Sequence, residues 1–174
     1  MVQSEEEIFE IRKKAHSYDQ YSGCSQSVLL ALQEGLKIGN LDSFKAATVL
    51  SGGVARRGET CGALLGALMA LGLVKGRENI EDTSTYVEAM GPANDIADEF
   101  MSRLDREFDF DEPLNTTLCR DIQERIYGRS FDIRIPEERQ AFLDAGGHSD
   151  EGCYKVCGVA AEIAARKLGK LRED

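Results

Sequence analysis

The stretch from Cys61 to Val74, CGALLGALMALGLV, decides the fold class of this chain. It is apolar on nearly every side, and a helix of that kind is typically buried at the centre of a protein. Within it, Gly62 and Gly66 each cost about 1 kcal/mol against alanine in a helix interior. We therefore expect these two glycines to be needed for close approach by a neighbouring helix, by a cysteine site or by a bound cofactor.

Amphipathic segments surround this apolar stretch. Apolar residues recur at helical spacing on both sides of it, and capping residues, glycine and proline mark the expected ends. Gly91-Pro92 predicts a kink or a break, because proline lacks a backbone donor. The expected helices cover residues 4–20 (capped by Ser4), 24–39, 42–50 (capped by Asp42), 61–74, 80–108, 118–127 (capped by Asn115–Thr117), 136–143 and 150–168. No repeat or strand-rich block occurs, so residues 1–174 are predicted to form one all-α domain, a multi-helix bundle around the central apolar helix 61–74.

Length and charge narrow the classes of function. A chain of 174 residues fits one domain that buries roughly 70% of its unfolded surface. Its formal net charge of -10 repels phosphate backbones and anionic headgroups, which argues against nucleic acid and membrane surfaces as partners. The longest apolar stretch is shorter than the roughly 20 residues that span a bilayer, and the acidic N-terminus lacks the features of a signal peptide. We expect a cytoplasmic protein without membrane insertion.

The chemistry of the chain is concentrated in its cysteines. The chain has five of them, an odd count, and a reducing cytosol does not favour a fixed disulfide framework. Four of them, Cys24, Cys61, Cys119 and Cys153, stand at the starts of expected helices. A helix start carries free backbone N–H groups and a partial positive charge, which favour a thiolate. We therefore expect these four cysteines to lie in one neighbourhood as redox thiols.

Cys61 is expected to be the most acidic of the five thiols, or the one most firmly bound to a metal. Thr60 can cap the helix that follows, and Arg56 and Arg57 stand shortly upstream. Arg120, Lys155 and His148 are further cations near cysteines. Deep burial acts in the opposite direction, because it raises the pKa of a thiol.

The same cysteines are candidate metal ligands. Cys157 follows Cys153 by four residues, hence by one helical turn, so the two can chelate a soft metal. The candidate ligands are Cys24, Cys61, Cys119, Cys153 and Cys157, and the candidate cofactors are an iron–sulfur cluster or zinc. No Cys-x-x-Cys occurs, so neither a zinc ribbon nor a thioredoxin-type site is indicated.

The motif Thr60-Cys61-Gly62-Ala63-Leu64-Leu65-Gly66-Ala67, set between Cys24 and the later Cys119 and Cys153, resembles the C_GCAxxG_C_C family of putative redox-active proteins. The resemblance covers about residues 21–168, between the N-terminal helix (1–20) and a tail (169–174). It implies a helical fold and a redox role. By position, Cys24, Cys61 and Cys119 match the first three family cysteines; Cys153 fits the fourth best, and Cys157 is the alternative.

Three hypotheses remain open. The leading one is a cysteine-based redox protein, either an oxidoreductase or an electron-transfer protein, with a thiol/disulfide or metal–thiolate centre and a redox partner protein. The second is a non-enzymatic protein that holds structural zinc. The third is a helical interaction module with inert buried cysteines, because a free cysteine also behaves as a small hydrophobe. A helix as apolar as residues 61–74 can also form a homodimer interface.

Overall fold

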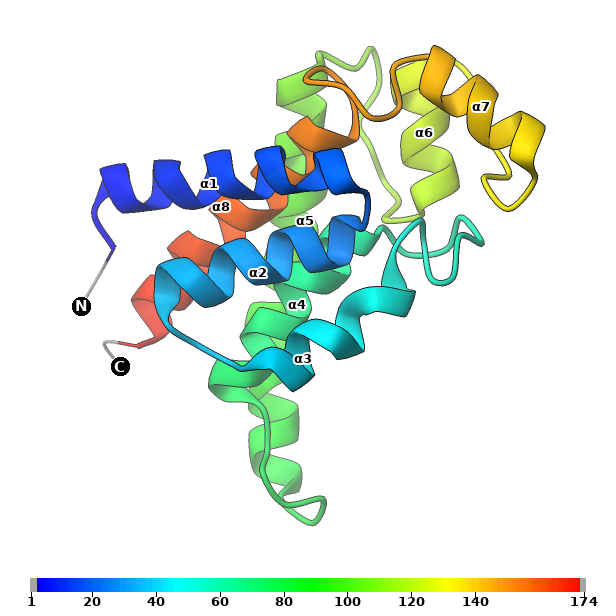
Figure 1. Ribbon diagram of the computed structural model, residues 1–174. Coiled ribbons are helices and arrows are strands. Elements are labelled where there is room, and N and C mark those ends of the chain that lie inside the picture. Colours follow the sequence, from blue (N-terminus) through cyan, green and yellow to red (C-terminus); the bar gives the residue numbers. More distant parts are fainter. Residues whose placement is uncertain (1–2, 173–174) are drawn as a thin grey trace.

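The computed structural model describes residues 3–172, and its secondary structure is helical (Figure 1). The helices are α1 (Glu5–Tyr18), α2 (Cys24–Leu36), α3 (Leu41–Ala46), α4 (Gly62–Lys75), α5 (Thr83–Phe108), α6 (Cys119–Tyr127), α7 (Pro136–Asp144) and α8 (Cys153–Leu171), with 3-10 turns η1 (Asp19–Tyr21) and η2 (Ala47–Leu50). Within residues 3–172 the one β-type pairing is an isolated bridge between Thr60 and Leu118. The predicted all-α class is confirmed.

Helices α4 and α8 form the centre of the bundle. Helix α4 packs against α2, α5 and α8, as its uniformly apolar sequence predicts. Helix α8 also packs against α1, and in Figure 1 it lies behind α1 and α2. Its alanines allow these close contacts, since Ala160, Ala161, Ala164 and Ala165 are all buried. The centre therefore contains two helices, of which the apolar pattern indicated one.

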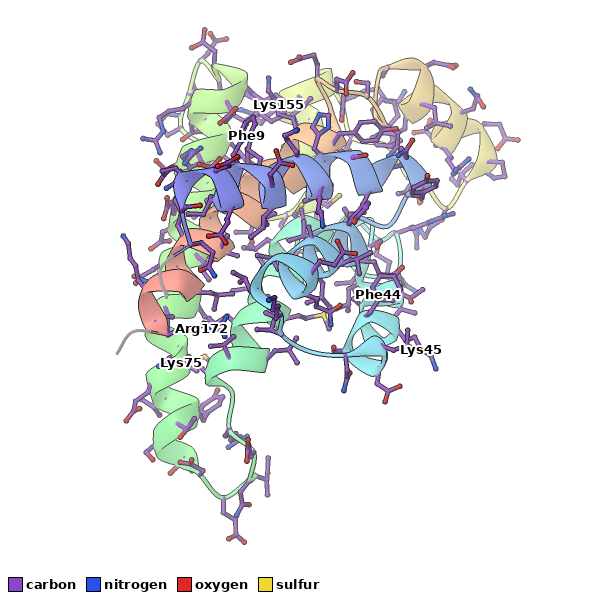
Figure 2. All side chains as sticks on the ribbon, turned by 60° about the vertical axis from the view of Figure 1, so that its left-hand side comes forward. Phe9, Phe44, Lys45, Lys75, Lys155 and Arg172 are labelled. Carbon is purple, nitrogen blue, oxygen red and sulfur yellow. The ribbon has the colours of Figure 1, made fainter. Side chains whose placement is uncertain are left out.

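Charged residues tie the outer face of α8 to its neighbours. Glu162 is nearly buried and lies 2.6 Å from a guanidinium nitrogen of Arg12 on α1 and 3.1 Å from one of Arg103 on α5. This network connects three helices. Other side chains point away from the bundle, as Figure 2 shows for Phe9 on α1 and Lys45 on α3.

Several predicted helix ends are wrong by a few residues. Asn40, rather than Asp42, caps α3, because its side chain accepts a hydrogen bond from Ser43 N at 3.0 Å. Cys61 itself is the N-cap of α4, and Leu118 is the N-cap of α6. The expected caps were Thr60 and residues 115–117. They belong instead to the extended segments that form the bridge between Thr60 and Leu118.

The break predicted at Gly91-Pro92 is absent, because α5 is one helix through this position. Proline cannot donate to the carbonyl of Glu88, but Glu88 is exposed, so water can satisfy that carbonyl. At the other end of the chain, α8 continues to Leu171 into the expected tail. Residues 173–174 of that tail lie outside the described residues. In the part of the chain that the structure describes, no helix combines the length and the apolar character needed to traverse a bilayer.

Candidate functional site

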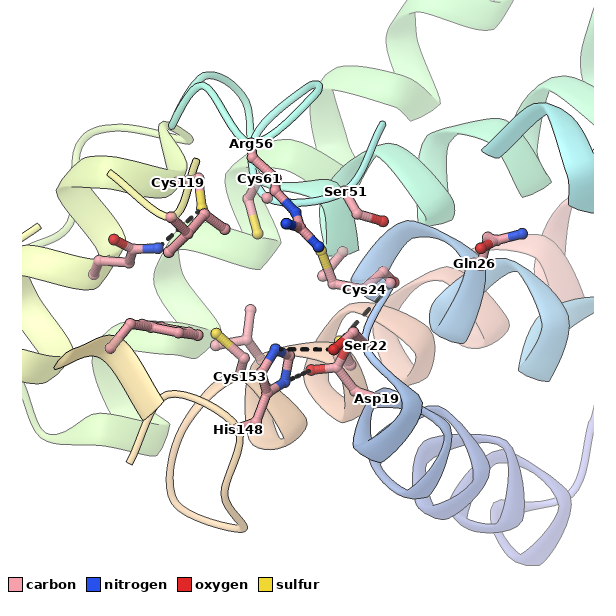
Figure 3. Close-up of a pocket in the computed structure, with 18 of the residues that line it drawn as sticks. Asp19, Ser22, Cys24, Gln26, Ser51, Arg56, Cys61, Cys119, His148 and Cys153 are labelled. Carbon is pink, nitrogen blue, oxygen red and sulfur yellow. Dashed lines mark hydrogen bonds and ion pairs between the residues drawn. The ribbon is translucent and has the colours of Figure 1, made fainter. Parts of the chain in front are cut away.

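The starts of α2, α4, α6 and α8 meet around a cavity of about 410 Å³. Five cysteines line it: Cys24, Cys61, Cys119, Cys153 and Cys157. Figure 3 shows the side chains of four of them pointing toward the same space from separate segments. All five are free thiols. The structure thus brings together the four cysteines expected in one neighbourhood, whereas their redox role stays a prediction.

The cysteines hold equivalent positions on their helices. Cys24, Cys119 and Cys153 are each the first residue of a helix, and Cys61 is the residue that caps α4. The prediction that these four cysteines stand at helix starts is therefore confirmed. Four helix N-termini, with their free N–H groups, face one cavity.

A short antiparallel pairing brings Cys61 and Cys119 together. Thr60 pairs with Leu118, and Cys61 N donates a hydrogen bond of 2.8 Å to Thr117 O. Side chains alternate between the two faces of paired extended segments. Cys61 and Cys119 each follow a bridge residue by one position, so both lie on the face opposite to Thr60 and Leu118. The bridge thereby directs two thiols into the cavity.

Two glycines of α4 allow α2 to come close. A Cβ added at Gly62 would lie 2.5 Å from Cys24 Sγ and 3.0 Å from Leu50 O. A Cβ added at Gly66 would lie 2.4 Å from Ser25 O, a backbone atom of α2. Both glycines thus lie where a helix or the cysteine site comes close. That they are needed for this approach stays a prediction. Their part in binding a cofactor stays a prediction.

The glycine-rich loop before α4 contains a left-handed run. Residues 52–56 all have positive φ, between 53° and 69°, and Val54, Ala55 and Arg56 are not glycines. This conformation costs roughly 1–2 kcal/mol for each residue that carries a Cβ. Backbone hydrogen bonds help to hold it, including one of 3.1 Å from Gly58 N to Gly52 O. The run ends with Arg56 at the cavity.

Burial governs the protonation of the thiols. It raises the pKa of all five cysteines, and the pKa of Cys61 is raised to about 11 although the backbone N–H groups of Ala63 and Leu64 act in the opposite direction. The expected depression of the Cys61 pKa is therefore wrong, because desolvation of the charged form outweighs the helix start. The rank of Cys61 among the five thiols stays a prediction.

Asp19 is a cavity residue that sequence reasoning missed. It is 0% exposed, and neither of its carboxylate oxygens has a hydrogen-bond partner among residues 3–172. Its Oδ2 lies 3.3 Å from His148 Nδ1. His148 Nε2 lies 3.5 Å from Ser22 Oγ (Figure 3). The negative charge of Asp19, second to burial, raises the pKa of the Cys24 thiol. The sequence did contain a signal that Asp19 is buried. Asp19 continues, at helical spacing, the buried stripe of the first helix that Ile8, Ile11 and Ala15 form.

Two further polar side chains contact the sulfurs. Gln123 Nε2 donates to Cys119 Sγ at 3.7 Å, and the amide oxygen of Gln123 accepts from Phe131 N at 2.9 Å. The second bond fixes which end of the amide faces the sulfur. Tyr127 Oη lies 3.5 Å from Cys153 Sγ. Cys119 and Cys153 are thus held in defined positions.

Cys157 lies deeper than Cys153. It is 0% exposed, and its thiol donates to Cys24 O at 3.9 Å, whereas Cys153 is half-buried. Both line the cavity, so either remains compatible with the fourth family position. Among residues 3–172 no group of three or more histidine, cysteine, aspartate or glutamate side chains is arranged to hold a metal ion. The metal-ligand role of the five cysteines stays a prediction.

The cations near the cavity differ from those expected. Arg56 and His148 line it, and so does Arg139 of α7, which the sequence did not indicate. Arg120 and Lys155 do not, because they pair with Glu59 at 3.0 Å and with Glu151 at 2.7 Å. Arg57 is also absent from the lining.

Comparison with known proteins gives one result. The family model described as "Putative redox-active protein (C_GCAxxG_C_C)" matches residues 22–167. The matched span includes all five cysteines and the segments that line the cavity from Ser22 onward. No curated protein and no solved structure matches the chain.

Proposed function

The chain belongs to the C_GCAxxG_C_C family of putative redox-active proteins, and from this membership we propose that it is an oxidoreductase or electron-transfer protein that uses cavity thiols in disulfide exchange. One observation carries the proposal: free cysteines from four separate segments line a single cavity. Inert cysteines that merely fill the core need not converge in this way. Family membership and convergence support the same chemistry independently.

Cys24 and Cys61 are the proposed exchanging pair. Cys24 Sγ packs against the α-carbon of Gly62, the residue that follows Cys61. The two thiols are close enough for Cys61, after burial and Asp19, to raise the pKa of Cys24. Neither cysteine has the side-chain hydrogen bond that Gln123 provides to Cys119.

The exchange proceeds in two steps. One cavity thiol loses its proton and attacks a sulfur of an external disulfide, which forms a mixed disulfide and releases one thiol. The second cavity thiol then attacks the mixed disulfide and releases the other thiol. In total, two cysteines lose two electrons and two protons, and the external disulfide gains them.

A metal–thiolate centre is the second candidate, because the convergence of several thiols also suits an iron–sulfur cluster or zinc. Binding requires thiolates, and the raised pKa values of the cavity thiols oppose their formation. The side chains must also move closer, since no ready group of three ligands exists among the described residues. A purely structural zinc site has the same requirements.

One preparation separates these candidates. The protein is purified without oxygen and examined for visible absorption, iron, sulfide and zinc, and its thiols are counted before and after treatment with excess 2-hydroxyethyl disulfide. We expect five thiols and no stoichiometric metal at first, then two fewer thiols and a Cys24–Cys61 bond in peptide mass mapping.

Two serine variants complete the design. Cys157→Ser should still form the Cys24–Cys61 bond, whereas Cys61→Ser should not. Stoichiometric iron with sulfide, or stoichiometric zinc, would favour the metal candidates. Five thiols that persist in the folded protein, although they react after unfolding, would contradict the proposed exchange.

A further inference from the structure

We propose that the cavity takes a low-molecular-weight disulfide that carries carboxylate groups, bound by Arg56 and Arg139; this inference rests on the proposed exchange function. The two arginines come from separate segments of the cavity lining, Arg56 from the loop before α4 and Arg139 from α7. They are 83 positions apart in the sequence (139 − 56), so their meeting is a property of the fold.

Both arginines are available to a ligand. They are exposed, and neither forms an ion pair with any described residue, although the chain has an excess of acids. Six of the eleven other arginines are paired with carboxylates, namely Arg12, Arg103, Arg120, Arg129, Arg134 and Arg166. An unpaired guanidinium offers a planar set of donors that matches a carboxylate.

Arg56 lines the same cavity as the thiols. It is the last residue of the left-handed run, and Figure 3 draws its side chain among those that line the cavity. A carboxylate bound there would place the rest of its molecule near both sulfurs of the proposed exchanging pair.

The charge at the cavity mouth favours an anion. Asp19 is the one acid among the described residues that line the cavity. It is 0% exposed and lies 3.3 Å from His148, whereas Arg56 and Arg139 are exposed. A ligand that enters therefore meets two positive charges first. The positive charge of these two arginines is opposite in sign to the net charge of -10 of the whole chain.

Size and burial favour a small molecule over a protein disulfide. The cavity has a volume of about 410 Å³, which suits a small organic ligand. Cys61 is 6% exposed and Cys119 is 9% exposed. The disulfide of a folded protein cannot reach such sulfurs without opening the bundle, whereas a small disulfide can enter the cavity. The reaction consumes one disulfide and two cavity thiols, and it yields one protein disulfide and two small thiols.

Three small disulfides test this inference at fixed pH and ionic strength. They are 3,3′-dithiodipropionate with two carboxylates, neutral 2-hydroxyethyl disulfide, and cystamine with two ammonium groups. Each rate of loss of cavity thiols is divided by the rate for the urea-unfolded chain, which corrects for intrinsic reactivity. We expect the dicarboxylate to react at least about tenfold faster than the neutral disulfide, because one hydrogen bond to a charged group contributes that much, and cystamine to react slowest.

Arginine variants locate the effect. Arg56→Gln and Arg139→Gln should each remove most of the preference for the dicarboxylate, measured as the ratio of its rate to the rate with 2-hydroxyethyl disulfide. Arg57→Gln is the matched control, because Arg57 neighbours Arg56 but does not line the cavity. Arg139 lies in a regular helix, so its variant remains informative if Arg56→Gln fails to fold, which a thermal melt would reveal.

The outcomes separate the two proposals. Equal corrected rates for the three disulfides would overturn the carboxylate inference and leave the exchange function standing. A preference for the dicarboxylate that survives in both arginine variants would also overturn it. Failure of all three disulfides to oxidise the folded protein would overturn the exchange function itself.

Discussion

Replacing Gly66 with alanine tests whether the close contact of α2 and α4 holds the cysteine cavity in shape. In a helix interior alanine is favoured over glycine by about 1 kcal/mol, so helix propensity alone predicts a more stable protein. The structure predicts the reverse. The added Cβ would lie 2.4 Å from Ser25 O and 3.0 Å from Val28 Cβ. Because Ser25 O is a backbone atom, α2 itself must move away from α4.

The expected loss of stability in Gly66→Ala follows from two opposing contributions. Overpacking of a filled core costs about 1–3 kcal/mol, and a backbone obstacle places this variant toward the upper end. Subtracting about 1 kcal/mol of helix propensity leaves a net destabilisation of about 1–2 kcal/mol. In a chain of this size each kcal/mol shifts the melting temperature by about 2–4 °C. We therefore expect Gly66→Ala to lower Tm by about 2–8 °C.

Gly72 provides a matched control on the same helix. It is exposed, and a Cβ added there would meet no atom within 4 Å. Gly72→Ala should therefore gain up to about 1 kcal/mol and raise Tm. Circular dichroism melts of the two variants measure the difference. If Gly66→Ala is as stable as Gly72→Ala, the α2–α4 contact does not limit packing and the reasoning is wrong.

Three further predictions concern charge. First, burial raises the pKa of Cys61 to about 11, above the value of about 8.5 in the unfolded chain. The stability that the protonated thiol contributes is therefore complete below about pH 8.5 and is lost as the pH rises toward 11. Urea unfolding at pH 7.5 and at pH 10 should show this decline, and equal free energies of unfolding at both would contradict it. Second, Asp19→Asn removes a charge that raises the thiol pKa of Cys24, so Cys24 should alkylate faster at fixed pH, as peptide mass mapping can measure. Third, burial acts to raise the pKa of Glu162, but its ion pairs with Arg12 and Arg103 lower it overall. The stability that these ion pairs of Glu162 contribute is present above the pKa of about 4.3 in the unfolded chain, and it is lost in acid. The Tm of Glu162→Gln should therefore fall less steeply in acid than the Tm of the unaltered protein.

Local patterns were sufficient to predict the helices and the convergence of the cysteines. Apolar spacing and a capping residue are properties of neighbouring positions, so Ser4 predicted the start of α1 correctly. The same reasoning located Cys24 and Cys153 at helix starts. Helix starts that carry thiols are natural neighbours in a bundle, and they do meet at one cavity.

The errors arose where distant segments decide the outcome. The sign of the Cys61 pKa shift depends on what covers the thiol, and neighbouring residues in the sequence do not show it. Arg139 reaches the cavity because α7 packs beside it, and no motif connects this residue with the cysteines. Likewise, Val54 and Ala55 have side chains that disfavour a left-handed backbone, so only the folded loop reveals that they adopt it.

The site therefore controls its chemistry by access. A thiol that reacts as an exposed thiolate oxidises with many partners, whereas these thiols are kept protonated by burial and, for Cys24, by the charge of Asp19. In the proposed exchange, attack on a disulfide then requires a molecule that enters the cavity and stays long enough for a rare thiolate to form. By our inference, Arg56 and Arg139 supply that residence for a carboxylate. On this reasoning, binding at the mouth and reaction at the sulfurs are coupled, so the selectivity of the exchange follows from the arginines rather than from an unusually acidic cysteine.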